Sequence, residues 1–460
     1  NLIYTEVRQV CGGVRIRMEY KYNDKITLPD LGREAVMNSV RRAENDFLKK
    51  ELAEKNTALD FYYNRNLDKH LEQWFPGSSL SQVPPFGMRV VPRFARSRMM
   101  LWKEPPERFI GGEPAEDYME IAHHLDSTIR EFSEIAWLIG KCYLRSKYNE
   151  RHERLEYDIV PHVKEYCTPD GDLFGVSYEV GKDHKGKRQF VFWSEARNGE
   201  PGLHFLFDTS SQIKQVGESM DNPYNIIPVS KVQFPSDSMD VARAALQVSI
   251  AMTEIALATR FALGQPVITG IDTEIPNLKA GIERLISLPE GASLQYVSPT
   301  GSIKDMIESV KMMVNQVGQN HSLAIRWGEG GTPPSGEALK ILSMENLESR
   351  ESDIPIFREW EASRYEIDRT ILQIHTGKVL PESYAVDFSE AGFPTTWAEE
   401  KDRLQFQLDN NLISRKELIR YFNEDITDDE LAEKMGELQE EEQPQQTTFE
   451  GLRRLGSVSA

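Results

Sequence analysis

Cysteine is almost absent from this sequence of 460 residues, which contains only Cys11, Cys142 and Cys167. Three cysteines without metal-ligand spacing predict neither a disulfide framework nor a zinc site, and they favour a reducing intracellular setting. A long uninterrupted apolar run is also missing. The most apolar stretch, 241–263, contains two arginines, a glutamine and a glutamate, so we expect it not to span a bilayer and expect no membrane partner. The first residues lack the basic and apolar pattern of a signal peptide.

Positive charge is scarce as well. The chain has 54 Lys and Arg against 73 Asp and Glu, a net charge of -19. Tight DNA binding depends on basic side chains that neutralise phosphates, so this balance excludes a protein that grips DNA firmly. Any DNA partner is expected to be held loosely. The length predicts two or three structural regions.

The common motifs of catalysis are missing too. The glycine-rich segment 328–336 is followed by Glu337, where a phosphate-binding G-x-x-x-x-G-K-[ST] loop needs lysine. No serine lies in a G-x-S-x-G turn. The one adjacent histidine pair, His123 and His124, is predicted on a helix, where neighbouring side chains point to different faces and form no metal pair. We therefore predict no enzyme activity, no catalytic residue, no cofactor and no metal site.

The first half of the chain has the pattern of a mixed helix and strand region. Helical periodicity covers 31–59 and 114–148, and the latter includes the apolar run 135–144. Short strand-like segments separated by turns follow at 155–160, 162–167, 173–180, 189–193, 203–208 and 226–234. The pair Asp170-Gly171 is typical of a hairpin turn. The predicted fold class is α+β.

A long helix is predicted over 236–264. Asp237 with Asp240 resembles a capping box at its start. Its small side chains would let copies of the helix approach closely; these are Ala244, Ala245, Ala251, Ala256, Ala258 and Ala262. Arg243, Gln247 and Glu254 form one polar stripe. An ordinary buried helix with a few paired polar groups is an equally good interpretation of this segment.

A compact insert, 265–301, separates this helix from a second one. The insert has strand-like segments at 267–271 and 294–297 and a short helix near 279–286. Ser302 with Asp305 resembles the capping box of the second helix, 302–326. Its predicted polar face consists of Lys304, Glu308, Lys311, Asn315 and Ser322, and its apolar face of Ile307, Val310, Met313, Val314 and Val317.

A loop rich in glycine and proline precedes a third long helix. The loop consists of Trp327, Gly328, Glu329, Gly330, Gly331, Thr332, Pro333, Pro334 and Ser335. Ser335 is predicted to cap a helix over 336–376, and Pro355 is expected to kink or break it because proline removes a backbone donor and clashes with the preceding turn.

The C-terminal part is predicted to be helical and acidic. Three capping boxes, Thr396 with Glu399, Ser414 with Glu417 and Thr427 with Glu430, predict helices at 397–409, 415–422 and 428–441. A DNA-reading helix-turn-helix is the alternative for the first two, with Arg415, Lys416 and Arg420 in a groove. The acidic residues after 422 would repel phosphates, so a packing or assembly role is favoured. A polar tail, 442–460, is expected to be disordered.

This order of elements resembles the portal proteins of tailed bacteriophages. The sequence Ser335-Gly336-Glu337-Ala338-Leu339-Lys340 follows the loop as a Ser-Gly-x-Ala-Leu sequence commonly does in that family. A strand at 225–229 precedes the first long helix, and the turn 412–414 precedes an acidic helical end. The likeness covers about 90–441, and the residues before about Leu31 match nothing in the family.

The resemblance implies a portal fold and a cyclic ring of about twelve subunits. It divides the chain into an α/β wing (1–235), first stem helix (236–264), small α/β clip (265–301), second stem helix (302–326), tunnel loop (327–335), long kinked helix (336–376), wing return (377–393), crown (394–441) and tail (442–460). The tunnel loop would project toward double-stranded DNA, which passes without regard to its sequence. Residues expected to face the channel are Lys304, Glu308, Lys311 and Lys340.

The resemblance also implies partners and a location. The large subunit of a separate terminase motor would hydrolyse ATP and dock on the clip, and an adaptor or head-completion protein would dock there later. The clip residues expected at this surface are Glu274, Lys279, Glu283, Arg284 and Glu290. The major capsid protein and a scaffold protein would contact the ring at the portal vertex of the virion, after assembly in the host cytoplasm.

Two other functions stay open. One is a capsid assembly or scaffold-like protein without a channel, and the other is a hydrolase. Rings with a central hole of about duplex width would favour the portal, and monomers with substrate-dependent activity would favour the hydrolase.

Overall fold

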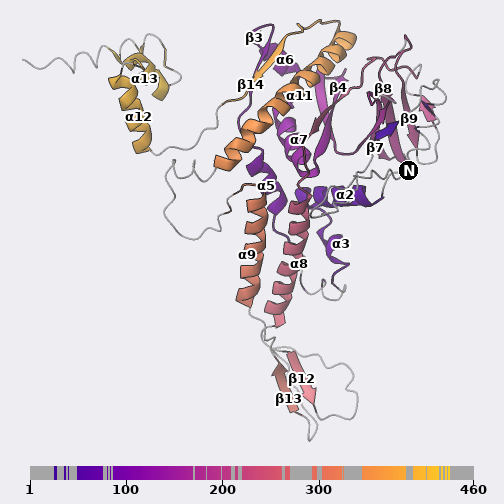
Figure 1. Cartoon of the computed structure of the whole chain (residues 1–460), viewed down its shortest axis with the longest axis vertical. Helices are drawn as coiled ribbons and strands as arrows, with labels where there is room; N and C mark the ends of the chain where they lie inside the picture. The colour runs from indigo at the N-terminus through magenta and orange to yellow at the C-terminus, as the bar shows by residue number, and fades with distance from the viewer. Residues whose placement is uncertain are drawn as a thin grey trace, which may run out of the picture. The chain divides into compact units, whose positions relative to one another are not determined.

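The computed structural model describes residues 25–27, 36, 37, 40, 49–75, 80, 83, 86–168, 171–182, 184–197, 199–208, 213–215, 220–261, 265–269, 293–297, 303–323, 325, 344–389, 397–410, 412–423, 426, 427, 430, 431, 434 and 435. The chain forms two compact units, Asn1–Trp327 with Ser343–Ala391 and Gly328–Leu342 with Gly392–Ala460. Helices and strands both occur in the first unit (Figure 1), which agrees with the predicted α+β class.

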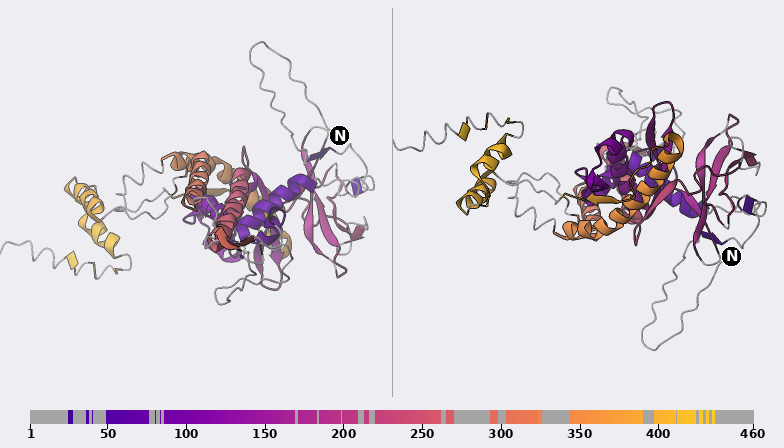
Figure 2. Two further views of the ribbon diagram at one scale, coloured as in Figure 1. Left: turned by 90° about the horizontal axis from the view of Figure 1, so that it is seen from below. Right: turned by 90° about the horizontal axis from the view of Figure 1, so that it is seen from above.

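The largest sheet of the first unit has six strands in the order β1-β6-β7-β8-β9-β10. They are β1 (Lys25–Thr27), β6 (Val163–Cys167), β7 (Leu173–Lys182), β8 (Arg188–Ser194), β9 (His204–Asp208) and β10 (Ile213–Gln215). Neighbours are antiparallel except β1, which pairs with β6 in parallel. The strands lie side by side in both views of Figure 2. The strands predicted at 162–167, 173–180, 189–193 and 203–208 are confirmed within one or two residues at each end.

Strand β8 shows how this sheet packs on both faces. Phe190 and Phe192 belong to one apolar cluster, together with Val36 and Val40. Val191 and Trp193 belong to another. Successive side chains of a strand point to opposite faces, so this alternation buries both sides of the sheet.

Two smaller sheets of three strands complete the strand content of the described first unit, apart from the hairpin between its long helices. One has the order β11-β4-β5, with β11 (Val229–Gln233), β4 (Lys141–Asn149) and β5 (Arg154–Val160). The other has the order β14-β2-β3, with β14 (Tyr384–Asp387), β2 (Glu107–Ile110) and β3 (Glu113–Pro114). The predicted strand 155–160 is confirmed, and the one predicted from 226 begins at Val229. Strand β14 returns a late segment of the chain to a sheet formed by early residues.

The predicted helix over 114–148 is wrong in its second half. The structure has α6 (Glu116–Ile121), α7 (Leu125–Ile139) and then β4. Gly140 ends α7 with φ 78, a left-handed conformation that favours glycine, and a Cβ there would lie 3.0 Å from the Cβ of Asp237. The apolar run 135–144 is therefore divided between a buried helix end and a buried strand start.

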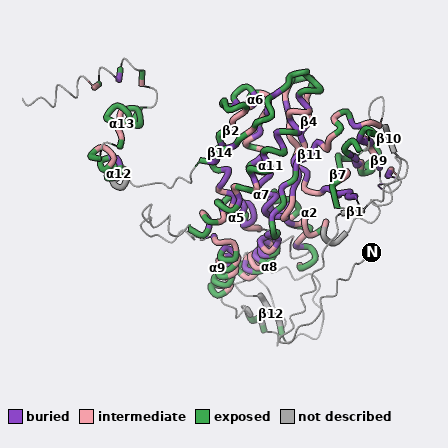
Figure 3. Tube along the Cα trace, turned by 45° about the horizontal axis from the view of Figure 1, so that its top comes forward, coloured by how far each residue is buried: buried purple, intermediate pink, exposed green. Residues whose placement is uncertain are grey.

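Several helices surround this core. They are α2 (Lys49–Tyr63), α3 (Leu67–Leu71), α5 (Val90–Arg98) and the 3-10 turn η2 (Met100–Trp102). Of the helix predicted over 31–59, the described parts are helical at 36, 37 and 40 and in α2. Figure 3 shows buried positions concentrated along α7 and β11, where the main core lies.

The long helix α11 (Met344–Thr376) passes through Pro355 without a break. The expectation that Pro355 breaks this helix is wrong, and the expected kink stays a prediction. Side chains on both sides of the proline hold the helix in place: Asp353 is paired with Arg98 at 2.5 Å, and Phe357 is fully buried with its ring 5.2 Å from that of Trp102. Tertiary packing thus outweighs the cost of the lost backbone hydrogen bond.

The described part of the second unit contains α12 (Trp397–Asp409) and α13 (Arg415–Phe422), as predicted. Ser414 Oγ accepts a hydrogen bond from Glu417 N at 3.2 Å, and Glu417 Oε2 accepts one from Ser414 N at 2.7 Å. This confirms the capping box. The capping box of Thr427 and Glu430 also forms: Thr427 N donates to Glu430 Oε2 at 3.1 Å, and Glu430 N donates to Thr427 Oγ1 at 3.4 Å. Thr396 lies outside the described residues, as does most of the helix predicted over 428–441 and the tail 442–460.

Candidate functional site

Two packed helices, α8 (Met239–Phe261) and α9 (Ile303–Asn320), run antiparallel. His321, just past the end of α9, contacts Asp240 in the first turn of α8, with 2.9 Å between Nε2 and Oδ1. At the other ends, α8 leads to β12 (Gln265–Thr269) and β13 (Ser293–Val297) leads to α9, and these two strands pair as an antiparallel hairpin. The chain thus leaves along one helix and returns along the other (Figure 1).

The start of α8 differs from the prediction. Asp237 Oδ1 accepts a hydrogen bond from Met239 N at 3.3 Å, but Asp240 is bound to His321 rather than closing a capping box. Partial burial alone would raise the pKa of Asp240, but the hydrogen bond and charge of His321 outweigh it and lower that pKa. Trp137 packs against the His321 ring with centroids 5.1 Å apart. The contact therefore connects the end of α9, the start of α8 and the main core.

Helix α9 ends at Asn320, six residues before the predicted end at 326. Ser322 has φ 58, Leu323 N donates to Gly318 O at 2.9 Å, and Ser322 N donates to Gln319 O at 3.1 Å. These two hydrogen bonds form a Schellman motif, in which serine takes the left-handed position usually held by glycine. This stop signal was missed in the sequence because serine rarely adopts that conformation.

The two faces of α9 agree with the prediction except at Ile307 and at Ser322, which lies beyond the end of the helix. Val310, Val314 and Gly318 are buried, spaced four residues apart. Lys304 and Glu308 are exposed and Lys311 is half-buried, with its Nζ 3.5 Å from Glu308 Oε1. Ile307, predicted on the apolar face, is 41% exposed, and Met312 is 69% exposed. A face with an exposed methionine and balanced charges lies open along this helix.

The alanines of α8 divide into two groups. Ala244 and Ala245 are buried by the chain itself, so the prediction that they face copies of the helix is wrong. Ala251 is half-buried against the chain's own core, whereas Ala256 and Ala258 are half-buried outside the main core cluster. The polar stripe is confirmed, since Arg243, Gln247 and Glu254 are all exposed. Ala262 lies outside the described residues.

Helix α8 can be compared with a membrane span. Met239–Arg260, with mean hydropathy 1.4, is long and apolar enough to cross a bilayer by length and composition, so the sequence argument that it is too polar does not hold. Core helices pass the same test, and 44% of its most apolar stretch is buried inside this protein. Ser249 and Thr253, both buried, donate to the carbonyls of Ala245 and Ser249 at 2.8 Å each.

The other predicted channel and docking residues cannot be placed. The tunnel-loop residues 327–335, Lys340 and the clip residues Glu274, Lys279, Glu283, Arg284 and Glu290 lie outside the described residues. So does the short helix predicted near 279–286. The expected contacts of these residues therefore stay predictions.

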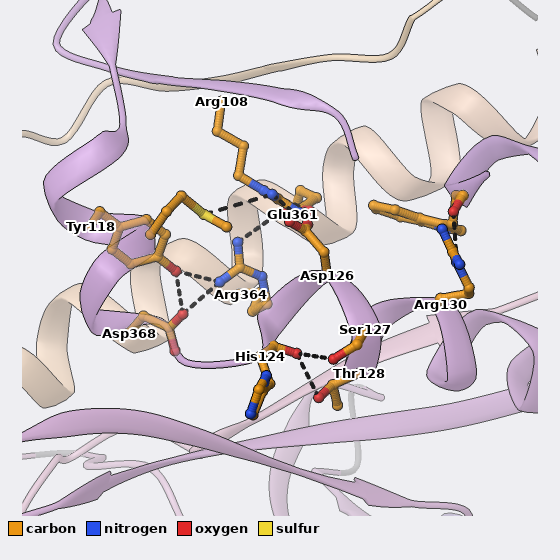
Figure 4. Close-up of polar contacts among 12 residues, drawn as sticks. Arg108, Tyr118, His124, Asp126, Ser127, Thr128, Arg130, Glu361, Arg364 and Asp368 are labelled. Atoms are coloured by element: carbon orange, nitrogen blue, oxygen red, sulfur yellow. Dashed lines mark hydrogen bonds and ion pairs between the residues drawn. The ribbon is translucent and has the colours of Figure 1, made fainter. Parts of the chain in front are cut away.

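A buried group of charged and tyrosine side chains, which we name the Arg364 cluster, was not foreseen. It consists of Arg108, Tyr118, Asp126, Tyr157, Glu361, Arg364, Asp368 and Tyr384 (Figure 4 shows part of it). Arg364 is fully buried at its centre. Its Nη1 donates to Asp368 Oδ2 at 2.5 Å and to the hydroxyl of Tyr118. Its Nη2 donates to Glu361 Oε2 and, at 3.2 Å, to the hydroxyl of Tyr384.

Arg108 supplies the second guanidinium of this cluster. Its Nε and Nη2 donate to Glu361 Oε1 at 3.2 and 2.8 Å, and its Nη1 donates to Asp126 Oδ1 at 2.7 Å. Burial alone would raise the pKa of Glu361, but Arg364 and Arg108 outweigh it and lower that pKa to about 2. The cluster therefore connects α11 to β2 and α7 through paired charges, and to α6, β5 and β14 through hydrogen bonds of tyrosine hydroxyls.

A weak signal for this cluster existed in the sequence. Glu361, Arg364 and Asp368 are spaced three and four residues apart, so they share one face of a helix. Such a row is usually a solvated surface, and its burial here depends on Arg108, more than 250 residues earlier, and on the tyrosines of other elements.

The histidine pair was also interpreted incorrectly. His123 and His124 lie in the turn between α6 and α7, and their ring centroids are 3.7 Å apart because His124 has φ 56. Within the described ranges, no group of three or more His, Cys, Asp or Glu could hold a metal ion.

Comparisons with known proteins give only distant likeness. No protein-family model matches the chain, and no curated protein matches it. The solved structures that are similar to it include the following three. A chain of the virion of a native gene transfer agent (GTA) particle matches with a TM-score of 0.36 and 14% identity, over 78% of this chain and 93% of that one. A chain from the neck of an empty GTA particle, computed with C6 symmetry, matches with a TM-score of 0.37 and 14% identity, over 78% of this chain and 93% of that one.

The third is from the neck of a native GTA particle computed with C12 symmetry, with a TM-score of 0.36 and 15% identity, over 77% of this chain and 92% of that one. The matched chains thus come from virion and neck assemblies. Scores of this size do not establish a common fold.

Proposed function

We propose that this chain is the subunit of a portal ring, a channel at one capsid vertex through which double-stranded DNA is packaged and later ejected. In this proposal it has no enzyme activity, and a separate terminase motor supplies the work of packaging.

The observation that carries the proposal is the antiparallel α8/α9 pair with a β-hairpin between its far ends. Helix α8 is anchored in the main core through Val241 and Val248 in its first half, and α9 is anchored through Val310 and Val314 in its middle. A helix of 23 residues is about 35 Å long. Such a pair forms a rod that is fixed at one end and carries a small strand unit at the other, which is the shape required for the wall of a channel.

Charge along this pair supports a passage for DNA rather than a binding site. Helix α8 contains two acidic and two basic residues, and α9 also contains two of each. Tight phosphate binding would require an excess of basic side chains. Neutral helices lining a channel would let a duplex slide.

The remaining regions take the following roles in the proposal. Residues 1–235 with 377–393 form the wing, which is consistent with the pairing of β14 and β2. The pair α8/α9 forms the stem, 265–301 the clip, 327–335 the tunnel loop, 336–376 the long helix behind it and 394–441 the crown. The terminase large subunit and an adaptor or head-completion protein bind the clip, and the ring sits in the virion, in contact with the major capsid protein.

Electron microscopy of the purified full chain, combined with a mass measurement, tests the proposal. About twelve copies of the 52.7 kDa chain would give rings of about 630 kDa with a central hole of about duplex width. Monomers, or closed particles without a hole, would contradict it. Particles without a hole that still join capsid proteins would favour a non-channel assembly protein.

A further inference from the structure

Helix α5 has a row of three exposed arginines, Arg89, Arg93 and Arg96, which we name the arginine row. Arg89 is the N-cap residue and the others follow at intervals of four and three, so all three lie on one face. At 1.5 Å per residue, the row is about 10 Å long. Three positive charges on one short face are unusual in a chain of net charge -19.

The arginine row is largely without partners in this protein. Among the described residues, the side chains of Arg89 and Arg93 have neither an ion pair nor a hydrogen bond. Arg96 is 66% exposed and has one loose contact, 3.6 Å between its Nε and Glu134 Oε2, and Glu134 already accepts a hydrogen bond from Tyr62. By contrast, Arg98 on the same helix is committed to Asp353 through two hydrogen bonds of 2.5 and 3.2 Å.

The helix that carries the row is held rigidly. Val90, Val91, Phe94 and Ala95 bury its other faces in the main core. Its end is joined to the first turn of α11, where Asn346 Nδ2 donates to Ser97 O at 2.8 Å. The three guanidinium groups are therefore presented from a fixed backbone, which reduces the entropy lost when they bind a partner.

We propose that the arginine row binds the phosphate backbone of double-stranded DNA as it passes through the ring. The inference rests on the proposed function and adds a contact surface to it. A duplex carries one negative charge per about 1.7 Å of its axis, so a length of about 10 Å presents about six phosphates. Guanidinium groups match phosphate oxygens in a two-pronged geometry. Three such groups on one line fit a regular array of phosphates better than the irregular charges of an acidic protein surface.

The contact is expected to be weak and independent of base sequence. Contacts to phosphate oxygens carry no sequence information, and the exposed residues of α5 besides the row are limited to serine. Three neutralised phosphates give a slope of about -2.7 for the logarithm of the binding constant against the logarithm of the salt concentration, a loss of about 40-fold between 50 and 200 mM salt. A duplex held this way is guided without being stopped.

The experiment measures fluorescence anisotropy of a labelled 30-bp duplex of random sequence with the full chain in 50 to 200 mM salt. The variant Arg89→Gln/Arg93→Gln/Arg96→Gln is expected to bind at least tenfold more weakly at 50 mM salt. The slope of its log binding constant against log salt concentration should become less steep, by up to about 2.7 for each subunit whose arginine row contacts the duplex. The control Arg151→Gln/Arg358→Gln/Lys378→Gln removes the same charge from exposed positions elsewhere in the first unit. It is expected to keep the wild-type slope.

Equal losses in the two variants would overturn the inference, because they would reflect the overall field of the protein. Undetectable binding by the wild type at 50 mM salt would also overturn it. Labelled polyglutamate serves as a probe for an acidic protein partner, and a triple Gln variant that binds DNA normally but no longer binds polyglutamate would overturn the inference as well. The variant Arg89→Lys/Arg93→Lys/Arg96→Lys keeps the charge and is expected to keep most of the slope, and Arg93→Gln alone is expected to lose about a third of it. Electron micrographs of the same preparations separate the two proposals: rings without an effect of the row refute only the row, and an effect without rings refutes only the channel.

Discussion

Replacing Arg364 by methionine is expected to destabilise the first unit strongly. The side chain is fully buried and is the only residue of the Arg364 cluster that contacts both Glu361 and Asp368. Methionine has a similar length but no charge, so two buried carboxylates lose their nearest cation. Glu361 keeps Arg108 at 2.8 Å, whereas Asp368 keeps only the hydroxyls of Tyr118 and Tyr157, at 2.6 and 2.9 Å.

The magnitude follows from the cost of leaving a buried charge without its partner. Removing one member of a buried ion pair typically costs about 3–5 kcal/mol. The upper part of this range applies to Arg364, because it also donates to the hydroxyls of Tyr118 and Tyr384. The double change Arg364→Met/Asp368→Asn removes the stranded charge and is expected to recover about 1–3 kcal/mol of the loss.

Urea unfolding followed by tryptophan fluorescence measures this loss. Trp360 is a local reporter, since its ring lies 5.9 Å from the guanidinium of Arg364. Arg358→Met, an exposed position on the same helix, is the matched control and is expected to stay within about 0.5 kcal/mol of the wild type. A loss below about 1 kcal/mol for Arg364→Met would refute the reasoning, since it would mean that water or relaxation replaces the guanidinium.

The pH dependence gives a second check. In the wild type, the pKa of Glu361 is lowered from 4.5 to about 2, so the stability that this shift contributes is present above pH 4.5 and is lost as the pH falls toward 2. In Arg364→Met the pKa of Glu361 should rise, because burial is then opposed by Arg108 alone. The folded variant then takes up a proton at a higher pH than the wild type, and its deficit relative to the wild type should shrink as the pH falls from 7 to 3. A deficit that is constant over this range would contradict the proposed charge pairing.

Three further predictions concern the proposed ring. Ala256→Phe should overpack the stem interface and prevent regular rings in electron micrographs. Gln247→Phe, on the opposite side of α8, is the control and should leave the rings intact. Normal rings with Ala256→Phe would show that Ala256 does not lie in the interface. Charge reversal at the five clip residues should lower terminase binding at least tenfold in a pull-down titration while rings persist, and unchanged binding would count against the clip assignment. Deletion of 330–333 should leave ring assembly intact but reduce packaging of DNA into empty capsids, and a normal rate and DNA length would exclude the tunnel loop from the mechanism.

Local signals in the sequence predicted most of the elements. Alternation of apolar residues located the strands of the large sheet, and Ser414 with Glu417 fixed the start of α13. These features depend on neighbours a few residues apart, so a single sequence contains them. The errors in helix ends occurred where a residue distant in the sequence determines where the helix begins or ends. Gly140 ends α7 against Asp237, and Asp240 is taken by His321 instead of capping α8.

The Arg364 cluster shows the same limit more clearly. The residues of α11 that form it look like an exposed row of charges, and their burial follows from Arg108 and the tyrosines of other elements. Pro355 is the converse case, since a local rule predicted a break that packing of Asp353 and Phe357 prevents. The predicted loop and clip residues lie outside the described residues, so their part of the site rests on the sequence.

The distribution of charge along the chain changes what the net charge means. Residues 392–460 contain 16 Asp and Glu against eight Lys and Arg, so this 69-residue segment carries -8 of the total of -19. The helices α8 and α9 are each neutral, and α5 has an exposed positive face. A duplex responds to the charges within about 8 Å of its surface at physiological salt, because more distant ones are screened. An acidic chain can therefore offer DNA a neutral wall with a short basic contact, and the total charge alone does not decide whether DNA is repelled, guided or bound.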